Sequence, residues 1–91
     1  MTKRILKYNI SLGGEDMVEI PVKSVVRSIQ IQDGALKLWA EVDDEEHEYC
    51  RRFFRALATG YDEIPENSVY ITTVQLGWTV WHIYETHVDE K

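Results

Sequence analysis

The sequence of 91 residues contains one cysteine, two prolines and no long apolar run. Because Cys50 stands alone, the chain can form neither an internal disulfide nor a thiolate metal cluster, and a reducing compartment is favoured. Lys3 and Arg4 are not followed by the apolar stretch of a signal peptide. No segment approaches the roughly 20 apolar residues that cross a bilayer. We therefore expect a cytoplasmic protein that does not bind a membrane.

Positive charge is also scarce, since 16 Asp and Glu residues outnumber 10 Lys and Arg residues and give a formal net charge of -6. A nucleic-acid-binding surface needs a basic face that neutralises phosphates, so direct binding to nucleic acid is not expected. Aromatic residues make up 11% of the chain, which is too much ring surface for a disordered protein. The length predicts a single domain over residues 1–91, with residues 85–91 as a frayed tail.

The strongest local signal is Asp33-Gly34 between two alternating runs, which is typical of a type I′ hairpin turn because both central residues need a positive φ. This turn sets a register that pairs Ile31 with Leu36, Ile29 with Leu38, Arg27 with Ala40, and Val25 with Val42. One face of the hairpin is then apolar and consists of Val25, Ile29, Ile31, Leu36, Leu38, Ala40 and Val42. The opposite face is polar except for Trp39.

Further strands are predicted on both sides of this hairpin. Residues 69–74 and 78–84 are rich in β-branched and aromatic residues and are separated by Gly77. Both faces of this second hairpin carry apolar residues, so we expect it to lie centrally in a sheet or to be covered on both faces. Near the N-terminus, residues 4–10 and 17–20 flank a Gly13-Gly14 turn.

Residues 45–58 admit two interpretations. A helix would place four apolar residues on one face, namely Cys50, Phe53, Phe54 and Leu57. In a strand, the apolar residues would alternate only imperfectly with the arginines. Periodicity alone favours the helix, whereas the neighbouring chain is strand-like throughout.

Several short motifs follow one another in a characteristic order. They are Glu19-Ile20-Pro21, Ser28-Ile29-Gln30-Ile31-Gln32-Asp33-Gly34, Leu38-Trp39-Ala40-Glu41-Val42-Asp43, Arg52-Phe53-Phe54, Ala58-Thr59-Gly60, Ile64-Pro65, Tyr70-Ile71-Thr72-Thr73-Val74 and Trp81-His82-Ile83-Tyr84-Glu85. In this order and spacing, residues 4–86 resemble an uncharacterised family of small β-rich proteins that are encoded mainly by tailed bacteriophages. For a phage protein, the compartment would be the cytoplasm of the host cell.

The resemblance implies an all-β domain in which 45–58 is a strand, and it transfers no catalytic residues. We therefore predict a small antiparallel sandwich or partly open barrel of about six or seven strands. A helix over 45–58 is the alternative.

Motifs for catalysis or metal binding are absent from the sequence. The spacing of His47, His82 and His87 does not suit a zinc site, and no nucleophile elbow or phosphate-binding loop occurs. Cys50 precedes two arginines whose charge favours a thiolate, although a lone cysteine is more often a small buried side chain. We expect no enzyme activity, no metal and no cofactor. A small hydrolase built on His82 and a carboxylate is a rival hypothesis.

Negative charge is concentrated in one segment, where six carboxylates occur within eight residues: Glu41, Asp43, Asp44, Glu45, Glu46 and Glu48. Three arginines, Arg51, Arg52 and Arg55, follow directly. The simplest interpretation is a solvated loop that keeps the protein soluble. The functional interpretations are a docking surface for a basic partner and an imitation of duplex phosphates.

Trp39 on a polar face and Trp78 beside a turn are candidate anchors of an interface. For Trp39 the alternative is coverage by another strand or by a second copy in a homodimer. We predict a non-catalytic protein that binds a host or phage protein. Its candidate binding residues are Trp39, Trp78, Trp81, His82, Arg51, Arg52, Glu41, Asp43, Asp44, Glu45, Glu46 and Glu48.

Two further hypotheses involve other partners. In one, Trp39, Arg51, Arg52, Trp78 and His82 form a pocket that sequesters a small nucleotide, with aromatic rings stacking on the base and arginines on the phosphates. In the other, the acidic segment mimics nucleic acid and inhibits a nucleic-acid-binding host protein.

Overall fold

The computed structural model describes residues 2–90, and this part of the chain contains seven strands and no helix. The strands are β1 (Lys3–Ile10), β2 (Glu15–Pro21), β3 (Val25–Gln32), β4 (Ala35–Asp43), β5 (Tyr49–Ala58), β6 (Val69–Leu76) and β7 (Thr79–Glu90). Every paired strand runs antiparallel to its neighbour. The predicted all-β class is confirmed. Within the described residues there is no helix long and apolar enough to cross a membrane.

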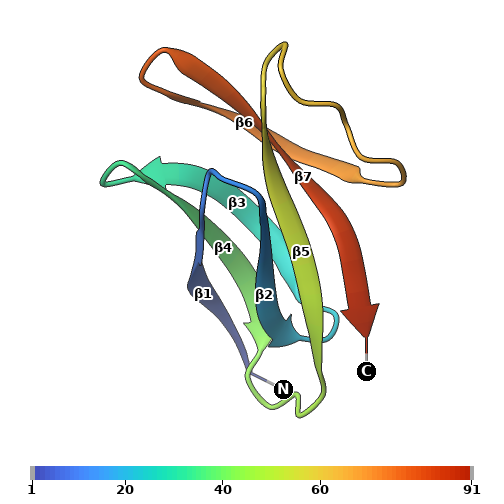
Figure 1. Ribbon diagram of the computed structural model, residues 1–91. Helices are drawn as coiled ribbons and strands as arrows, with labels where there is room; N and C mark the ends of the chain where they lie inside the picture. The colour runs from blue at the N-terminus through green and yellow to red at the C-terminus, as the bar shows by residue number, and fades with distance from the viewer. Residues whose placement is uncertain (1, 91) are drawn as a thin grey trace.

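The strands form two sheets that pack face to face (Figure 1). The three-stranded sheet has the order β1-β4-β3, and the four-stranded sheet has the order β2-β5-β7-β6. Strands β3 and β6 contact each other at one side of the sandwich. Since β1 and β2 are at the opposite ends of these two orders, they border the other side. The sheets are not joined into a barrel, so the sandwich is the correct one of the two predicted architectures.

The core lies between the two sheets and follows the alternation of their strands. In β4 the buried residues are Leu36, Leu38, Ala40 and Val42, and the residues between them point away from the core. The four-stranded sheet contributes buried apolar side chains from three strands: Val18, Ile20, Cys50, Phe54, Ala56 and Ile83. We call the face of each sheet that points into the core its inner face and the other its outer face.

The hairpin of β3 and β4 confirms the predicted turn and corrects the predicted register. Asp33 and Gly34 both have positive φ, at 53° and 77°. The register holds as far as Ser28 opposite Trp39, but a bulge at Arg27 then shifts it by one residue. Arg27 is the extra residue, so Val26 lies opposite Ala40, and Val25 lies opposite Glu41 and is exposed.

The bulge has a clear physical reason. In the predicted register the charged Arg27 would face the core beside Ala40. With the bulge, Val26 packs against the core instead, and the Arg27 guanidinium donates to Glu41 at 2.8 Å and 3.1 Å on the outer face. The predictions that Arg27 pairs with Ala40 and that Val25 belongs to the apolar face are therefore wrong.

The ambiguous segment forms strand β5, preceded by a loop over residues 44–48. The inner face of β5 carries Cys50, Arg52, Phe54 and Ala56, so a charged side chain occupies one core-facing position. Leu57 is buried although it belongs to the outer face, because the connection from β5 to β6 lies beside it. Phe53 is a further apolar residue on the outer face, and these three exceptions together break the strand alternation and produce the misleading helical period.

The C-terminal part of the chain is paired. Residues 85–90, which the sequence predicts to be a frayed tail, continue β7 alongside β5 as far as Glu90 opposite Cys50. In the second hairpin β7 is central, as predicted, whereas β6 is an edge strand. The outer face of this hairpin has no covering sheet.

Candidate functional site

The three tryptophans lie in three different environments. Trp39 is half-buried on the outer face of β4, opposite Ser28 and Lys7 in the neighbouring strands. Trp81 points inward from β7 and packs against the core. Trp78 lies in the turn between β6 and β7 and is 102% exposed. Of the three, Trp78 alone offers its whole ring to solvent.

The acidic segment 41–48 is partly neutralised within the chain. Glu41 pairs with Arg27 at 2.8 Å and with Lys3 at 3.4 Å, and Asp44 pairs with Arg4. The hydrogen bond from Arg27 lowers the pKa of Glu41 below its ordinary value. The bond to Asp44 raises the pKa of Arg4. These pairs tie the segment to β1 and β3.

The remaining carboxylates of the segment shape the loop. Asp43 accepts from the backbone N–H of Glu45 at 3.0 Å, and Glu46 accepts from that of Glu48 at 3.0 Å. Only Glu41 and Asp43 belong to a strand, and the chain turns after them. The six carboxylates therefore do not form a straight row.

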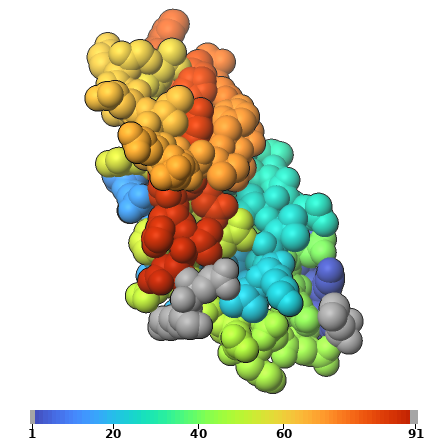
Figure 2. Space-filling view, turned by 90° about the vertical axis from the view of Figure 1, so that its right-hand side faces the viewer, coloured from blue at the N-terminus to red at the C-terminus, as the bar shows by residue number. Residues whose placement is uncertain are grey.

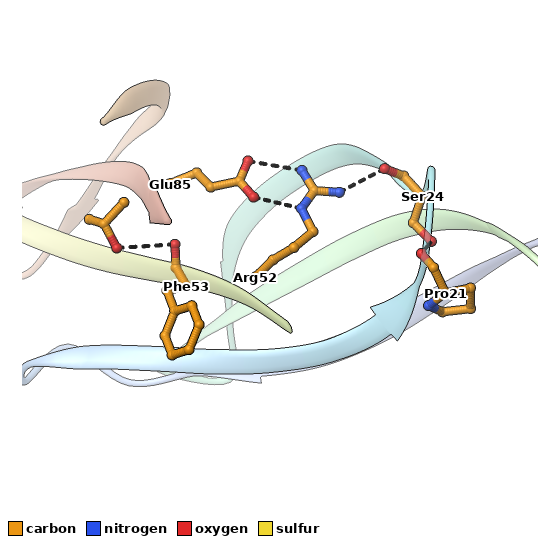
Figure 3. A network of polar contacts seen from close by, with 6 residues as sticks. Pro21, Ser24, Arg52, Phe53 and Glu85 are labelled. Atoms are coloured by element: carbon orange, nitrogen blue, oxygen red, sulfur yellow. Dashed lines mark hydrogen bonds and ion pairs between the residues drawn. The ribbon is translucent and has the colours of Figure 1, made fainter. Parts of the chain in front are cut away.

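Arg52 is held by two partners in the interior of the sandwich (Figure 3). Its Nε and Nη2 donate to the two carboxylate oxygens of Glu85 at 2.6 Å and 2.9 Å, and its Nη1 donates to the carbonyl of Ser24 at 2.7 Å. The hydroxyl of Ser24 in turn donates to the carbonyl of Pro21 at 2.6 Å. The bond to Glu85 raises the pKa of Arg52. This cluster links β5, β7 and the turn between β2 and β3.

Arg51 points to the outer face and pairs with Asp89 at 2.9 Å. Its Nε is buried, and no described residue accepts a hydrogen bond from it. Both candidate arginines are thus engaged within the chain, and they lie on opposite faces of β5.

His82 is the centre of a hydrogen-bond chain on the outer face of the four-stranded sheet. Its Nε2 lies 2.7 Å from the hydroxyl of Thr59, which donates to the carbonyl of Val80 at 3.1 Å. Its Nδ1 lies 3.0 Å from the hydroxyl of Thr73, which lies 2.7 Å from that of Tyr70. A neutral imidazole with its hydrogen on Nε2 satisfies every donor in this chain. Through these hydrogen bonds, His82 of β7 connects Thr59, which directly follows β5, with Thr73 of β6.

A pocket of about 190 Å³ opens beside His82. It is lined mostly by apolar atoms, and its residues are Leu57, Ala58, Thr59, Gly60, Asp62, Ile64, His82 and Tyr84. The Asp62 carboxylate already accepts the backbone N–H of Ala58 at 2.8 Å. The pocket is smaller than the 300–1,000 Å³ that is usual for cofactor sites, and its size suits a single ring or aliphatic side chain.

The other titratable candidates lie apart from this pocket. Cys50 is buried on the inner face of β5, His47 is exposed in the acidic loop, and the ring of His87 contacts Phe53 with centroids 5.6 Å apart. Within residues 2–90, no group of three His, Cys, Asp or Glu side chains has the arrangement of a metal site.

The candidate residues do not converge on one site. Trp39 and His82 lie on the two outer faces of the sandwich, which point in opposite directions, and Arg52 lies between the sheets. The turn that carries Trp78 and the acidic loop lie at opposite ends of the molecule (Figures 1 and 2). The structure therefore does not assemble the set that was expected to hold a nucleotide.

Thr59 and Thr73 are partners of His82 that sequence reasoning missed, and Tyr70 extends the hydrogen-bond chain through Thr73. Placing the second turn at Gly77-Trp78 would have identified Thr73, because this turn puts Thr73 opposite His82. Thr59 comes from a separate part of the chain, and no local pattern indicates its contact with His82.

Comparison with known proteins identifies the family. Residues 1–91 match the Domain of unknown function DUF7352, and the chain belongs to this family. This confirms the expectation of an uncharacterised family. No curated protein and no solved structure matches the chain.

Proposed function

We propose that this member of the DUF7352 family is a non-catalytic binding module that docks on a protein partner with Trp78 as its anchor. The resemblance to phage-encoded proteins supports a phage origin, and the partner would then be a host or phage protein in the host cytoplasm. The lack of catalytic motifs supports a role in binding.

The exposure of Trp78 is the observation that carries this proposal. Its ring is fully exposed at the tip of the hairpin of β6 and β7. This tip lies at one end of the molecule (Figure 1). Two-residue hairpin turns favour Gly, Asn and Asp, so the backbone conformation of this turn does not require a tryptophan after Gly77. Tryptophan is also among the residues that contribute most to protein interfaces, since it buries a large and rigid surface. A binding role explains a side chain that the fold does not need.

The acidic segment plays a secondary part in this proposal. It lies at the end of the molecule opposite Trp78, so it does not extend the contact around that ring (Figure 1). Its uneven arrangement favours long-range attraction of a basic partner over imitation of regularly spaced phosphates. Attraction of this kind raises the association rate and weakens with added salt.

The test compares three immobilised proteins as baits for a host lysate: the wild type, Trp78→Ala, and the control variant Tyr61→Ala. Tyr61 is an exposed ring in the connection from β5 to β6 and does not belong to the β6–β7 turn. We expect a partner that is retained by the wild type and by Tyr61→Ala and is lost with Trp78→Ala. Loss of about 2 kcal/mol or more is typical of an anchor tryptophan and corresponds to an affinity weaker by about thirtyfold or more. Equal retention by all three baits would show that Trp78 is not the anchor.

A further inference from the structure

We propose that the protein forms a two-fold homodimer in which β1 of one copy pairs antiparallel with β2 of the other. Four features of the molecule support this arrangement: the position of these edges, their charge, their exposed apolar residues and their symmetry.

Strands β1 and β2 are open edges on the same side of the sandwich. Each is the terminal strand of its sheet, whereas the edges on the opposite side, β3 and β6, contact each other. Open edges expose unpaired backbone groups and invite pairing with another chain. The side that carries β1 and β2 is therefore where a further strand can be added to each sheet.

The two edges have opposite charge. β1 contains Lys3, Arg4 and Lys7 and no acidic residue, whereas β2 contains Glu15, Asp16 and Glu19 and no basic residue. Pairing β1 with β1, or β2 with β2, would place like charges across the new ladder, which is destabilising. Pairing β1 with β2 of a second copy places opposite charges together.

Apolar side chains on these edges are incompletely covered in the single chain. Leu6 lies opposite Ala40 on the inner face, yet it is 42% exposed. On the outer faces, Ile5 of β1 is 55% exposed and Met17 of β2 is 50% exposed. Covering these side chains with a second copy would remove apolar surface from water.

The outer faces of the two edge strands carry complementary patterns. On the outer face of β1, Lys3 and Lys7 flank Ile5, and on the outer face of β2, Glu15 and Glu19 flank Met17. These residues share the outer face, since they alternate with core-facing residues in both strands. In the single chain the Lys7 ammonium donates to the side-chain oxygen of Gln32 at 3.0 Å. Because this oxygen is neutral, the hydrogen bond does not pair the charge of Lys7 with a carboxylate.

Two-fold symmetry closes this assembly. Strands β1 and β2 run in opposite directions and are joined by the turn at residues 11–14 (Figure 1). A two-fold axis parallel to the strands therefore brings β1 onto the partner's β2 and, at the same time, β2 onto the partner's β1. Both pairs are antiparallel, and each sheet continues into the other sheet of the second copy. Such an isologous contact makes a closed dimer and not a fibre.

The test uses Lys7→Glu and Glu15→Lys, alone and mixed, in sedimentation equilibrium from about 10 μM to about 1 mM. The wild type is expected to show a dimer of twice 10.7 kDa. In each variant alone, position 7 of one copy and position 15 of the other carry like charges in both β1–β2 contacts, so dimerisation should weaken at least tenfold. In the equimolar mixture of the two variants, positions 7 and 15 again carry opposite charges in both β1–β2 contacts of the heterodimer. A heterodimer should therefore form about as well as the wild-type dimer.

Glu66→Lys is the matched control, because Glu66 is exposed in the connection from β5 to β6, outside both β1 and β2, and its charge change should leave the dimer intact. Three results would overturn the proposal: a wild type that stays monomeric throughout the range, single variants that dimerise like the wild type, or a mixture that stays monomeric. Recovery in the mixture also shows that the single variants are folded.

Discussion

Arg51 and Arg52 are neighbours in the sequence, and each pairs with a carboxylate of β7, yet their environments differ strongly. Arg52 and Glu85 are only 15% and 12% exposed, whereas Arg51 and Asp89 are 37% and 44% exposed. Arg52 makes two hydrogen bonds to Glu85 and a third to Ser24. Arg51 makes one to Asp89 and leaves its buried Nε without a partner among the described residues.

This difference shows that a charge on the inner face of a sheet must be matched by several acceptors. The desolvated guanidinium of Arg52 would be costly alone, and the Glu85 carboxylate and the Ser24 carbonyl supply its acceptors. On the outer face, water screens the pair of Arg51 and Asp89, and a single bond is sufficient there.

Removing Arg52 should have the largest effect. Arg52→Ala leaves the Glu85 carboxylate in the core without its partner, so we expect the free energy of unfolding to fall by about 3 kcal/mol. For a domain of this size, such a loss corresponds to a melting temperature lower by about 12 °C or more. Urea unfolding followed by circular dichroism measures it.

Replacing both partners separates the cost of an unpaired charge from the value of the pair. The double variant Arg52→Met with Glu85→Leu keeps the volume and leaves no buried charge, so its stability should lie within about 1 kcal/mol of the wild type. A double variant as unstable as Arg52→Ala would contradict this explanation.

Removing Arg51 should have a smaller effect. Its pair with Asp89 is more than a third exposed and is screened by solvent, so Arg51→Ala should lower the free energy of unfolding by about 0.5 kcal/mol. The same urea experiment checks this, and about 0.5 M added salt should reduce the difference further. A loss equal to that of Arg52→Ala would remove the distinction between the two faces.

Removing the exposed pair of Arg27 and Glu41 should have the smallest effect on stability, and the titration of Glu41 reveals it. Because the hydrogen bond from Arg27 lowers the pKa of Glu41, the stabilisation from this pair is present above the ordinary pKa of Glu and is lost as the pH falls through the lowered value. In Arg27→Ala, the NMR titration midpoint of Glu41 should rise toward its ordinary value. Arg55→Ala is the control and should leave that midpoint unchanged.

Much of the fold could be predicted from local patterns. The Asp33-Gly34 turn and the alternation of β4 act over a few residues, so they indicate the hairpin directly. The bulge at Arg27 could not be predicted in this way. It depends on which of two neighbouring side chains the opposite sheet can cover, and this is a property of the packed sandwich.

The candidate site was less predictable than the fold. Exposure of Trp78 was expected from its place beside the Gly77 turn. The partners of His82, in contrast, come from the end of β5 and from β6, and only the folded chain brings them together.

The sequence by itself determined the strands outside residues 45–58 and the single concentrated acidic segment, because strand alternation, turn chemistry and charge are local properties. For residues 45–58 its periodicity favoured a helix, and the packing of the two sheets makes most of this segment a strand. Tertiary structure decided that Arg52 is an interior residue and Arg51 a surface residue. It also placed Trp78 and the acidic loop at opposite ends of the molecule and left β1 and β2 as edges of opposite charge on one side. The reason is that the surroundings of a side chain depend on strands that are distant in the sequence and meet only when the two sheets pack.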